Sequence, residues 1–175
     1  ITKSTLDFLG GNEKRPFFVW AHYIETHSPY LPPSQFIEDR PKGRKIKSID
    51  QKIIAGERKH MDKDSQEGDF LALYDAAVKF TDSEVGKILD LIFKKGYDKN
   101  SIIIFSSDHG EDLGEYNYFY NHGPLTFQHS IRVPLIMYIP GENSRRIRYP
   151  VSLMDIYPTI LGKIGLSLPY EVQGI

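Results

Sequence analysis

Cysteine is absent from the 175 residues of this chain. Disulfides, thiolate metal sites and a cysteine nucleophile are therefore excluded within these residues, while the compartment is left open. The sequence has no apolar run near the ~18 residues that a helix needs to cross a bilayer, so we expect no membrane segment. Its 22 Lys and Arg nearly balance its 23 Asp and Glu, and this lack of a basic field argues against a nucleic-acid partner.

The sequence also lacks an initiating methionine and a signal peptide. It begins at Ile1 within a helix-like pattern that Gly10 and Gly11 end. We therefore interpret the chain as a piece of a longer protein whose N-terminal half is absent. Its hydrophobic content of 40% is typical of a globular protein, and its length suits one domain.

Apolar runs that predict strands lead directly into polar residues at two places. Residues 102–105 precede Asp108 and His109, and residues 17–21 precede the histidines at 22 and 27. Short, continuous runs of this composition are typical of strands buried on both faces. Because ligands of open α/β sheets bind beyond the carboxyl ends of the strands, Asp108 and His109 form a candidate metal or phosphate-type site.

From the residues alone, each of these assignments has a structural alternative. Asp108 and His109 also fit an ordinary loop in which the aspartate caps the turn and the histidine is solvated, and short motifs match by chance. His22 is better explained as a buried, hydrogen-bonded histidine. His27 precedes Ser-Pro-Tyr in a loop and is better explained by function.

The longest helix is predicted over residues 69–95 by an apolar period of about 3.6 residues, with Gly96 as its C-terminal cap. A further buried strand is predicted within residues 131–141. A helix followed by a buried strand is typical of parallel sheets. We therefore predict an α/β fold with a mainly parallel sheet and helices on both faces.

Two further segments complete the expected organisation. Ser152 is expected to cap a short helix that continues to Gly162 or Gly165. Residues 38–67 are highly charged without clear periodicity, which predicts an exposed excursion, disordered or forming a lid on the substrate side. A basic run at residues 42–47 would meet an anionic substrate, although a solvated loop is the commoner explanation.

Five blocks of sequence resemble one family in its order and roughly its spacing. They are PFFVWAHYIETHSPYLPP at residues 16–33, and residues 74–92, 102–115, 121–141 and 151–174. The chain resembles the sulfatases of the alkaline phosphatase superfamily, specifically the C-terminal part of their catalytic domain. The resemblance implies an incomplete alkaline-phosphatase-like fold, in which residues 1–175 form a single partial catalytic domain.

The resemblance implies roles for four residues. Asp108 matches the family's late metal-binding aspartate, and His109 stands where members carry Asn or His as the adjoining ligand. His27 matches the histidine that contacts the sulfate group and the leaving-group oxygen, which makes it the candidate general acid. His122 stands where the family places Lys or His on the sulfate. Gln128 departs from the Glu of many members.

The implied cofactor is a divalent metal ion. The carboxylate of Asp108 suits Ca²⁺, the first choice, or Mg²⁺, and the nitrogen of His109 makes Mn²⁺ a further option. The family's formylglycine nucleophile, made from Cys or Ser in CxPxR or SxPxR, and its early Asp-Asp pair would lie upstream of Ile1. We therefore expect the chain alone to be inactive, to bind metal weakly and to self-associate through an exposed sheet edge.

The resemblance thus implies that the parent protein is a sulfuric ester hydrolase with a sulfate ester as its substrate. The runner-up is a phosphonate monoester or phosphodiester hydrolase, or a phosphoethanolamine transferase, of the same superfamily. The RVPLI and VSLMDIYPTIL blocks favour the sulfatase branch. A non-catalytic module that kept the fold is the alternative from another class, and it would tolerate the loss of Asp108 and His109.

Overall fold

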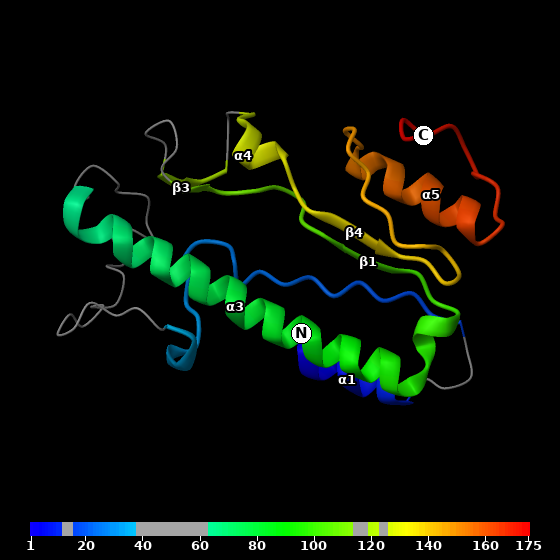
Figure 1. Ribbon diagram of the computed structural model, residues 1–175, viewed down its shortest axis with the longest axis horizontal. Coiled ribbons are helices and arrows are strands. Elements are labelled where there is room, and N and C mark those ends of the chain that lie inside the picture. Colours follow the sequence, from blue (N-terminus) through cyan, green and yellow to red (C-terminus); the bar gives the residue numbers. More distant parts are fainter. Residues whose placement is uncertain (12–15, 38–62, 114–118, 123–125) are drawn as a thin grey trace. The chain divides into compact units, whose positions relative to one another are not determined.

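The computed structural model describes residues 1–11, 16–37, 63–113, 119–122 and 126–175. The chain divides into two compact units, Ile1–Gly96 with Leu113–Asn121, and Tyr97–Asp112 with His122–Ile175. Most of the predicted charged excursion at residues 38–67 lies outside the described residues. Figure 1 labels the α-helices and most of the strands of the two units.

The first unit is built on the long helix α3, Lys63–Lys95 (Figure 1). The predicted helix over residues 69–95 is confirmed, although α3 begins at Lys63. Gly96 takes the left-handed conformation with φ of 72°, and its N–H donates to the carbonyl of Phe93 at 3.1 Å. This conformation and this hydrogen bond confirm the expected glycine cap. Glycine suits the position because it adopts a positive φ without steric cost.

Helix α1, Thr2–Gly11, packs against α3 in the first unit. Leu9 of α1 is buried, as are Leu73, Ala76 and Ala77 of α3. The short 3-10 helix η1, Ser34–Phe36, also contacts α3. Tyr30 is fully buried and meets Tyr74 edge to face, with ring centroids 5.3 Å apart. These contacts form the core of the unit.

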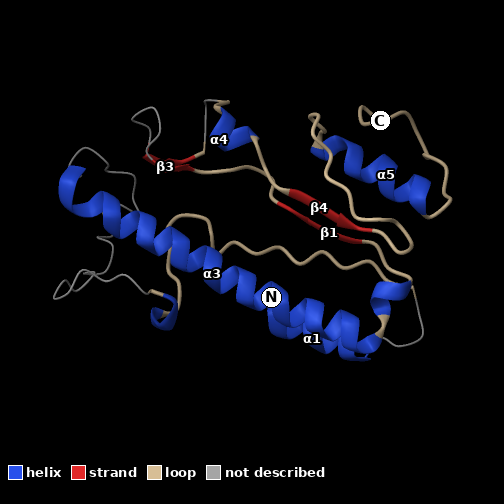
Figure 2. Cartoon of the chain, viewed as in Figure 1, coloured by secondary structure: helices blue, strands red, loops and turns tan. Residues whose placement is uncertain are grey.

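Residues 17–21 form no strand, so this strand prediction is wrong. Figure 2 draws the segment as a loop. Phe18 and Trp20 are 77% and 78% exposed, whereas a strand buried on both faces would cover them. A strand requires ladder hydrogen bonds to a neighbour, and the described residues supply none for this run. His22, expected to be buried, is exposed as well.

The second unit contains the strands β1, Ile103–Ser106, and β4, Leu135–Tyr138, which pair antiparallel. In this register Ser106 at the end of β1 lies opposite Leu135 at the start of β4. The chain thus leaves and re-enters the ladder at the same end, whereas a parallel pair needs a crossover to the opposite end. Among the described residues this pair therefore runs antiparallel, as one strand at the edge of a mainly parallel sheet often does.

The ladder of β1 and β4 is also half-exposed and not buried on both faces. Phe105, Ile136 and Tyr138 are 44%, 63% and 40% exposed. Exposure alternates along β4, as expected for an antiparallel strand with one face toward solvent. Two shorter strands, β2 (Asp112–Leu113) and β3 (Phe119–Asn121), form a second two-stranded sheet.

The remaining elements belong to the second unit. They are the 3-10 helix η3 (Tyr97–Lys99), helix α4 (Gln128–Ile131), the 3-10 helix η5 (Leu153–Asp155) and helix α5 (Ile156–Lys163).

A membrane-spanning helix is not found among the described residues, because none of their helices combines the necessary length with the necessary apolar character.

The predicted cap at Ser152 is confirmed, because its Oγ accepts a hydrogen bond from the N–H of Met154 at 3.2 Å. Asp155 completes the capping box by accepting from the N–H of Ser152 at 2.9 Å. Helix α5 then ends before Gly165, which has φ of 75°. Of the two predicted endings, Gly162 lies within α5 and Gly165 follows its end, so Gly165 is the one that the structure shows.

Candidate functional site

The loop after β1 presents Asp108 and His109 together, as the sequence predicts. Oδ1 of Asp108 accepts a hydrogen bond from the backbone N–H of His109 at 3.0 Å. The same oxygen lies 3.8 Å from Nε2 of His109. Oγ of Ser107 donates to the carbonyl of His109 at 2.5 Å. These bonds hold the carboxylate and the imidazole on the same side of the loop.

His122, which follows His109 by 13 positions in the sequence, joins this pair. Its ring stacks on the ring of His109, with centroids 3.8 Å apart and planes inclined by 22°. Three of the four predicted site residues, Asp108, His109 and His122, therefore lie together in the second unit. The fourth, His27, belongs to the first unit.

Both stacked rings have an acceptor at Nδ1. Nδ1 of His109 lies 2.8 Å from the carbonyl oxygen of Gly110, and Nδ1 of His122 lies 3.2 Å from Oε1 of Glu111. A carbonyl and a carboxylate only accept hydrogen bonds, so Nδ1 carries the proton in each ring. In the neutral ring the lone pair is then on Nε2, the tautomer that binds a metal through Nε2.

His27 shows the same arrangement in the first unit. Its Nδ1 lies 2.6 Å from the carbonyl oxygen of Ser28, which again assigns the proton to Nδ1. The backbone N–H of His27 donates to the carbonyl of Ile24 at 3.0 Å, closing a turn. The side chain is exposed, as a group that meets a substrate must be.

The loop that carries Asp108 and His109 is fastened to helix α4 by two contacts. The N–H of Gly110 donates to the carbonyl of Ser130 at 2.7 Å. Two residues later, Oδ2 of the fully buried Asp112 lies 2.8 Å from Nε2 of His129. Glu111 stands between these two fastened positions, and only 6% of its side chain is exposed.

Sequence reasoning missed Glu111, Asp112 and His129. The available signal was the consecutive carboxylates Glu111 and Asp112 directly after Asp-His-Gly, with histidines at 122 and 129 downstream. Each carboxylate pairs with one of these histidines. Gln128, where the family often has Glu, is the first residue of α4 and is exposed.

Asp108 and His109 fit part of a metal site. Metal contacts of about 2.0–2.6 Å from oxygen or nitrogen reach across about 4 Å, so donors 3.8 Å apart can share one ion. Within the described residues no group of three or more His, Cys, Asp and Glu is close enough to hold a metal ion. The two donors therefore need ligands beyond these residues.

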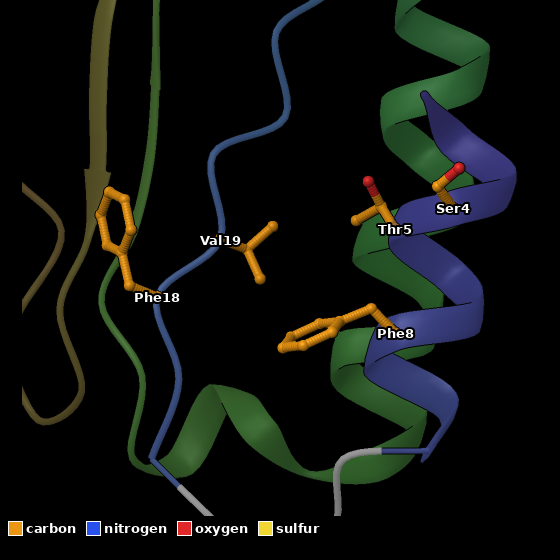
Figure 3. A pocket seen from close by; sticks show the side chains of 5 residues that line it. All are labelled: Ser4, Thr5, Phe8, Phe18 and Val19. Atoms are coloured by element: carbon orange, nitrogen blue, oxygen red, sulfur yellow. The ribbon is translucent and has the colours of Figure 1, made fainter.

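A pocket in the first unit has a different character (Figure 3). It lies between α1 and the extended segment near Val19 and is lined by Ser4, Thr5, Phe8, Phe18 and Val19. The lining is apolar apart from two hydroxyl groups and contains no titratable side chain, so it offers no groups for acid-base or metal chemistry.

Comparison with known proteins gives a consistent set of relatives. A family model described as Sulfatase matches residues 1–166. An endo-4-O-sulfatase of Bacteroides thetaiotaomicron is 32% identical over 166 residues, which are 92% of this chain and 32% of that protein. An arylsulfatase of Clostridium perfringens is 24% identical, covering 100% of this chain and 40% of the relative.

A solved structure supports the same fold. A protein described in connection with glycosaminoglycan metabolism by Bacteroides thetaiotaomicron superposes with a TM-score of 0.75 at 29% identity, covering 99% of this chain and 36% of that one. The chain thus spans about a third of the length of these relatives. The prediction of an incomplete α/β domain of the alkaline-phosphatase type is confirmed by this likeness.

Proposed function

Because this chain belongs to the sulfatase family, we propose that it supplies part of the active site of a metal-dependent sulfuric ester hydrolase. The observation that carries the proposal is the meeting of Asp108, His109 and His122 in one unit, from segments on either side of β2 and β3. The substrate is a sulfate ester, and the nucleophile, a formylglycine, stands upstream of this chain.

Asp108 and His109 would hold the metal, through a carboxylate oxygen and through Nε2. When bound, a divalent ion would supply positive charge to the sulfate oxygens. Ca²⁺ is the first candidate because the aspartate is a hard oxygen ligand, with Mg²⁺ or Mn²⁺ as alternatives. Both donors are accessible, since their side chains are 70% and 38% exposed.

The histidines would act on the sulfate group itself. His122 would donate a hydrogen bond to a non-bridging sulfate oxygen, where charge develops in the displacement. His27 would give its proton to the departing alkoxide as a general acid, for which an imidazole is suited near neutral pH. Nδ1 of His27 faces the carbonyl of Ser28, so Nε2 is the atom that transfers the proton.

We further propose that residues 1–175 act as one partial catalytic domain and that residues 38–67 contribute to substrate selection. The chain without the rest of the active site would lack hydrolase activity and would self-associate.

The proposal is tested in the longer protein that contains this chain, assayed with sulfate esters of different leaving groups. We expect His27→Ala to lower kcat by about 10²–10⁴-fold for an alkyl sulfate and by much less for a nitrophenyl sulfate, whose leaving group needs no proton. His22→Ala, an exposed histidine of the same segment, is the control. Faster turnover of phosphonate monoesters or phosphodiesters, or activity that survives loss of both Asp108 and His109, would contradict the proposal.

A further inference from the structure

Glu111 contacts the imidazole of His122 from a nearly enclosed position. Its side chain is 6% exposed, and its Oε1 lies 3.2 Å from Nδ1 of His122, which is 27% exposed. A carboxylate withdrawn from water is costly unless it accepts hydrogen bonds. A solvated carboxylate at a loop surface would show neither this burial nor this fixed partner.

The backbone on both sides of Glu111 is anchored. Gly110 before it is bonded to Ser130, and Asp112 after it is buried against His129. The starting point of the Glu111 side chain is therefore fixed by its neighbours. A carboxylate held in this way orients a ring far better than one on a freely moving loop.

The plane of the His122 ring is fixed by a second contact. The stacked ring of His109 lies 3.8 Å away, centroid to centroid, which resists tilting of the imidazole. A 180° flip about the Cβ–Cγ bond would exchange Nδ1 with Cδ2 and Nε2 with Cε1, and the hydrogen bond between Nδ1 and Glu111 opposes this flip. Together the two contacts fix where Nδ1 and Nε2 of His122 lie.

We propose that Glu111 is a positioning residue that binds Nδ1 of His122 and thereby presents Nε2 to an oxygen of the sulfate group. This inference rests on the sulfate-binding role of His122 in the proposed function. Glu111 itself does not touch the substrate. In the neutral ring the contact assigns the proton to Nδ1 and leaves only a lone pair on Nε2. In the charged ring Glu111 accepts from one N–H, at Nδ1, and the other N–H, at Nε2, donates to the sulfate oxygen.

The test uses the longer protein that contains this chain and two variants of it, Glu111→Gln and Glu111→Ala. Both substitutions remove the same negative charge, but the amide oxygen of Gln still accepts a hydrogen bond from Nδ1. A difference between the two variants therefore reports orientation and not charge. Glu171→Ala, which removes an exposed glutamate of the same unit, is the matched control, and backbone amide spectra verify that each variant is folded.

The first readout is the tautomer of His122, read from the ring nitrogen shifts in long-range ¹H–¹⁵N NMR spectra above pH 8. We expect the proton on Nδ1 in the wild type, in Glu111→Gln and in Glu171→Ala, and a shift toward the Nε2–H form in Glu111→Ala. An Nδ1–H tautomer retained in Glu111→Ala overturns the proposal.

The second readout is a titration of the same signals with inorganic sulfate at pH 6. We expect the dissociation constant for sulfate to be about tenfold higher in Glu111→Ala than in Glu111→Gln. Equal constants in the two variants overturn the positioning role. If sulfate leaves the His122 signals of the wild type unchanged, His122 does not bind sulfate, and the proposal that Glu111 presents it to sulfate is overturned as well. The tautomer spectra still decide separately whether Glu111 orients the ring.

Discussion

Asp112 and His129 form a buried polar pair, with Oδ2 of the aspartate 2.8 Å from Nε2 of the histidine. The carboxylate has no solvent exposure, and the imidazole is 14% exposed. The pair joins the residue that ends the Asp-His-Gly loop to helix α4. Both contacting atoms are buried away from water, although their geometry is not that of a hydrogen bond, so the pair is a close polar contact between the loop and the helix.

The first prediction concerns the cost of breaking this pair. His129→Ala removes the imidazole that contacts the buried carboxylate of Asp112 and should lower the free energy of unfolding by about 3–5 kcal/mol. The double variant Asp112→Leu with His129→Leu removes both polar groups and should cost less than the single change. Urea unfolding, followed through the amide signals of the second unit, measures both. A double variant less stable than His129→Ala would show that the pair is not the source of the effect.

The second prediction concerns Gly110. A Cβ at this position would lie 1.9 Å from the carbonyl oxygen of His129, and a backbone atom cannot move aside as a flexible side chain can. Gly110→Ala should therefore destabilise the second unit by at least about 1–3 kcal/mol.

The control for Gly110→Ala is Gly86→Ala in α3. A Cβ at Gly86 meets nothing within 4 Å, so this change should stabilise the helix by about 0.5–1 kcal/mol. Thermal unfolding of the two variants should move in opposite directions. A neutral outcome at Gly110 would contradict the close approach of the loop to α4.

The third prediction concerns Asp155 and pH. Hydrogen bonds from the backbone N–H groups of Ser152 and then Ile175 lower the pKa of its carboxyl. Because the pKa of Asp155 is lower in the folded chain than in the unfolded chain, the ionised carboxylate stabilises the fold fully above the usual pKa near 3.9. This contribution to stability is lost as the pH falls through the pKa of the folded chain. We expect Asp155→Asn to be less stable than the wild type at pH 7 and equal to it at the lowest pH.

The Asp155 prediction is checked by urea unfolding of wild type and Asp155→Asn between pH 7 and pH 2.5. Glu171→Ala serves as a control, because Glu171 is an exposed carboxylate of the same unit. A difference between wild type and Asp155→Asn that stays constant over this range would exclude the carboxylate as its cause.

The elements that depend on local patterns could be predicted from the sequence. The apolar period and the lysine-glycine ending identified α3, and Ser152 identified the start of η5, because capping chemistry and helical periodicity are local properties. The run at residues 17–21 has the composition of a strand but is extended and exposed. Strand formation depends on a neighbour, which composition does not specify.

The site was predictable only where a motif marked it. Asp-His-Gly and Asn-His-Gly identified Asp108, His109 and His122, and the structure places these together. Glu111 contacts His122, 11 positions later in the sequence, and Asp112 contacts His129, 17 positions later. Only the fold brings each carboxylate against its histidine. Such pairing has no period, so the sequence offered two carboxylates and two histidines without indicating the partners.

The exposure of Trp20 has a consequence for spectroscopy. It is the single tryptophan of the chain, it is 78% exposed and it belongs to the first unit. Its fluorescence in the isolated chain should already resemble that of an indole in water, and it is a poor reporter of unfolding in the unit that holds Asp108 and His122. The same indole is a sensitive reporter of anything that covers residues 17–21, and its emission should move to shorter wavelength as protein concentration rises if copies of the chain associate through this segment.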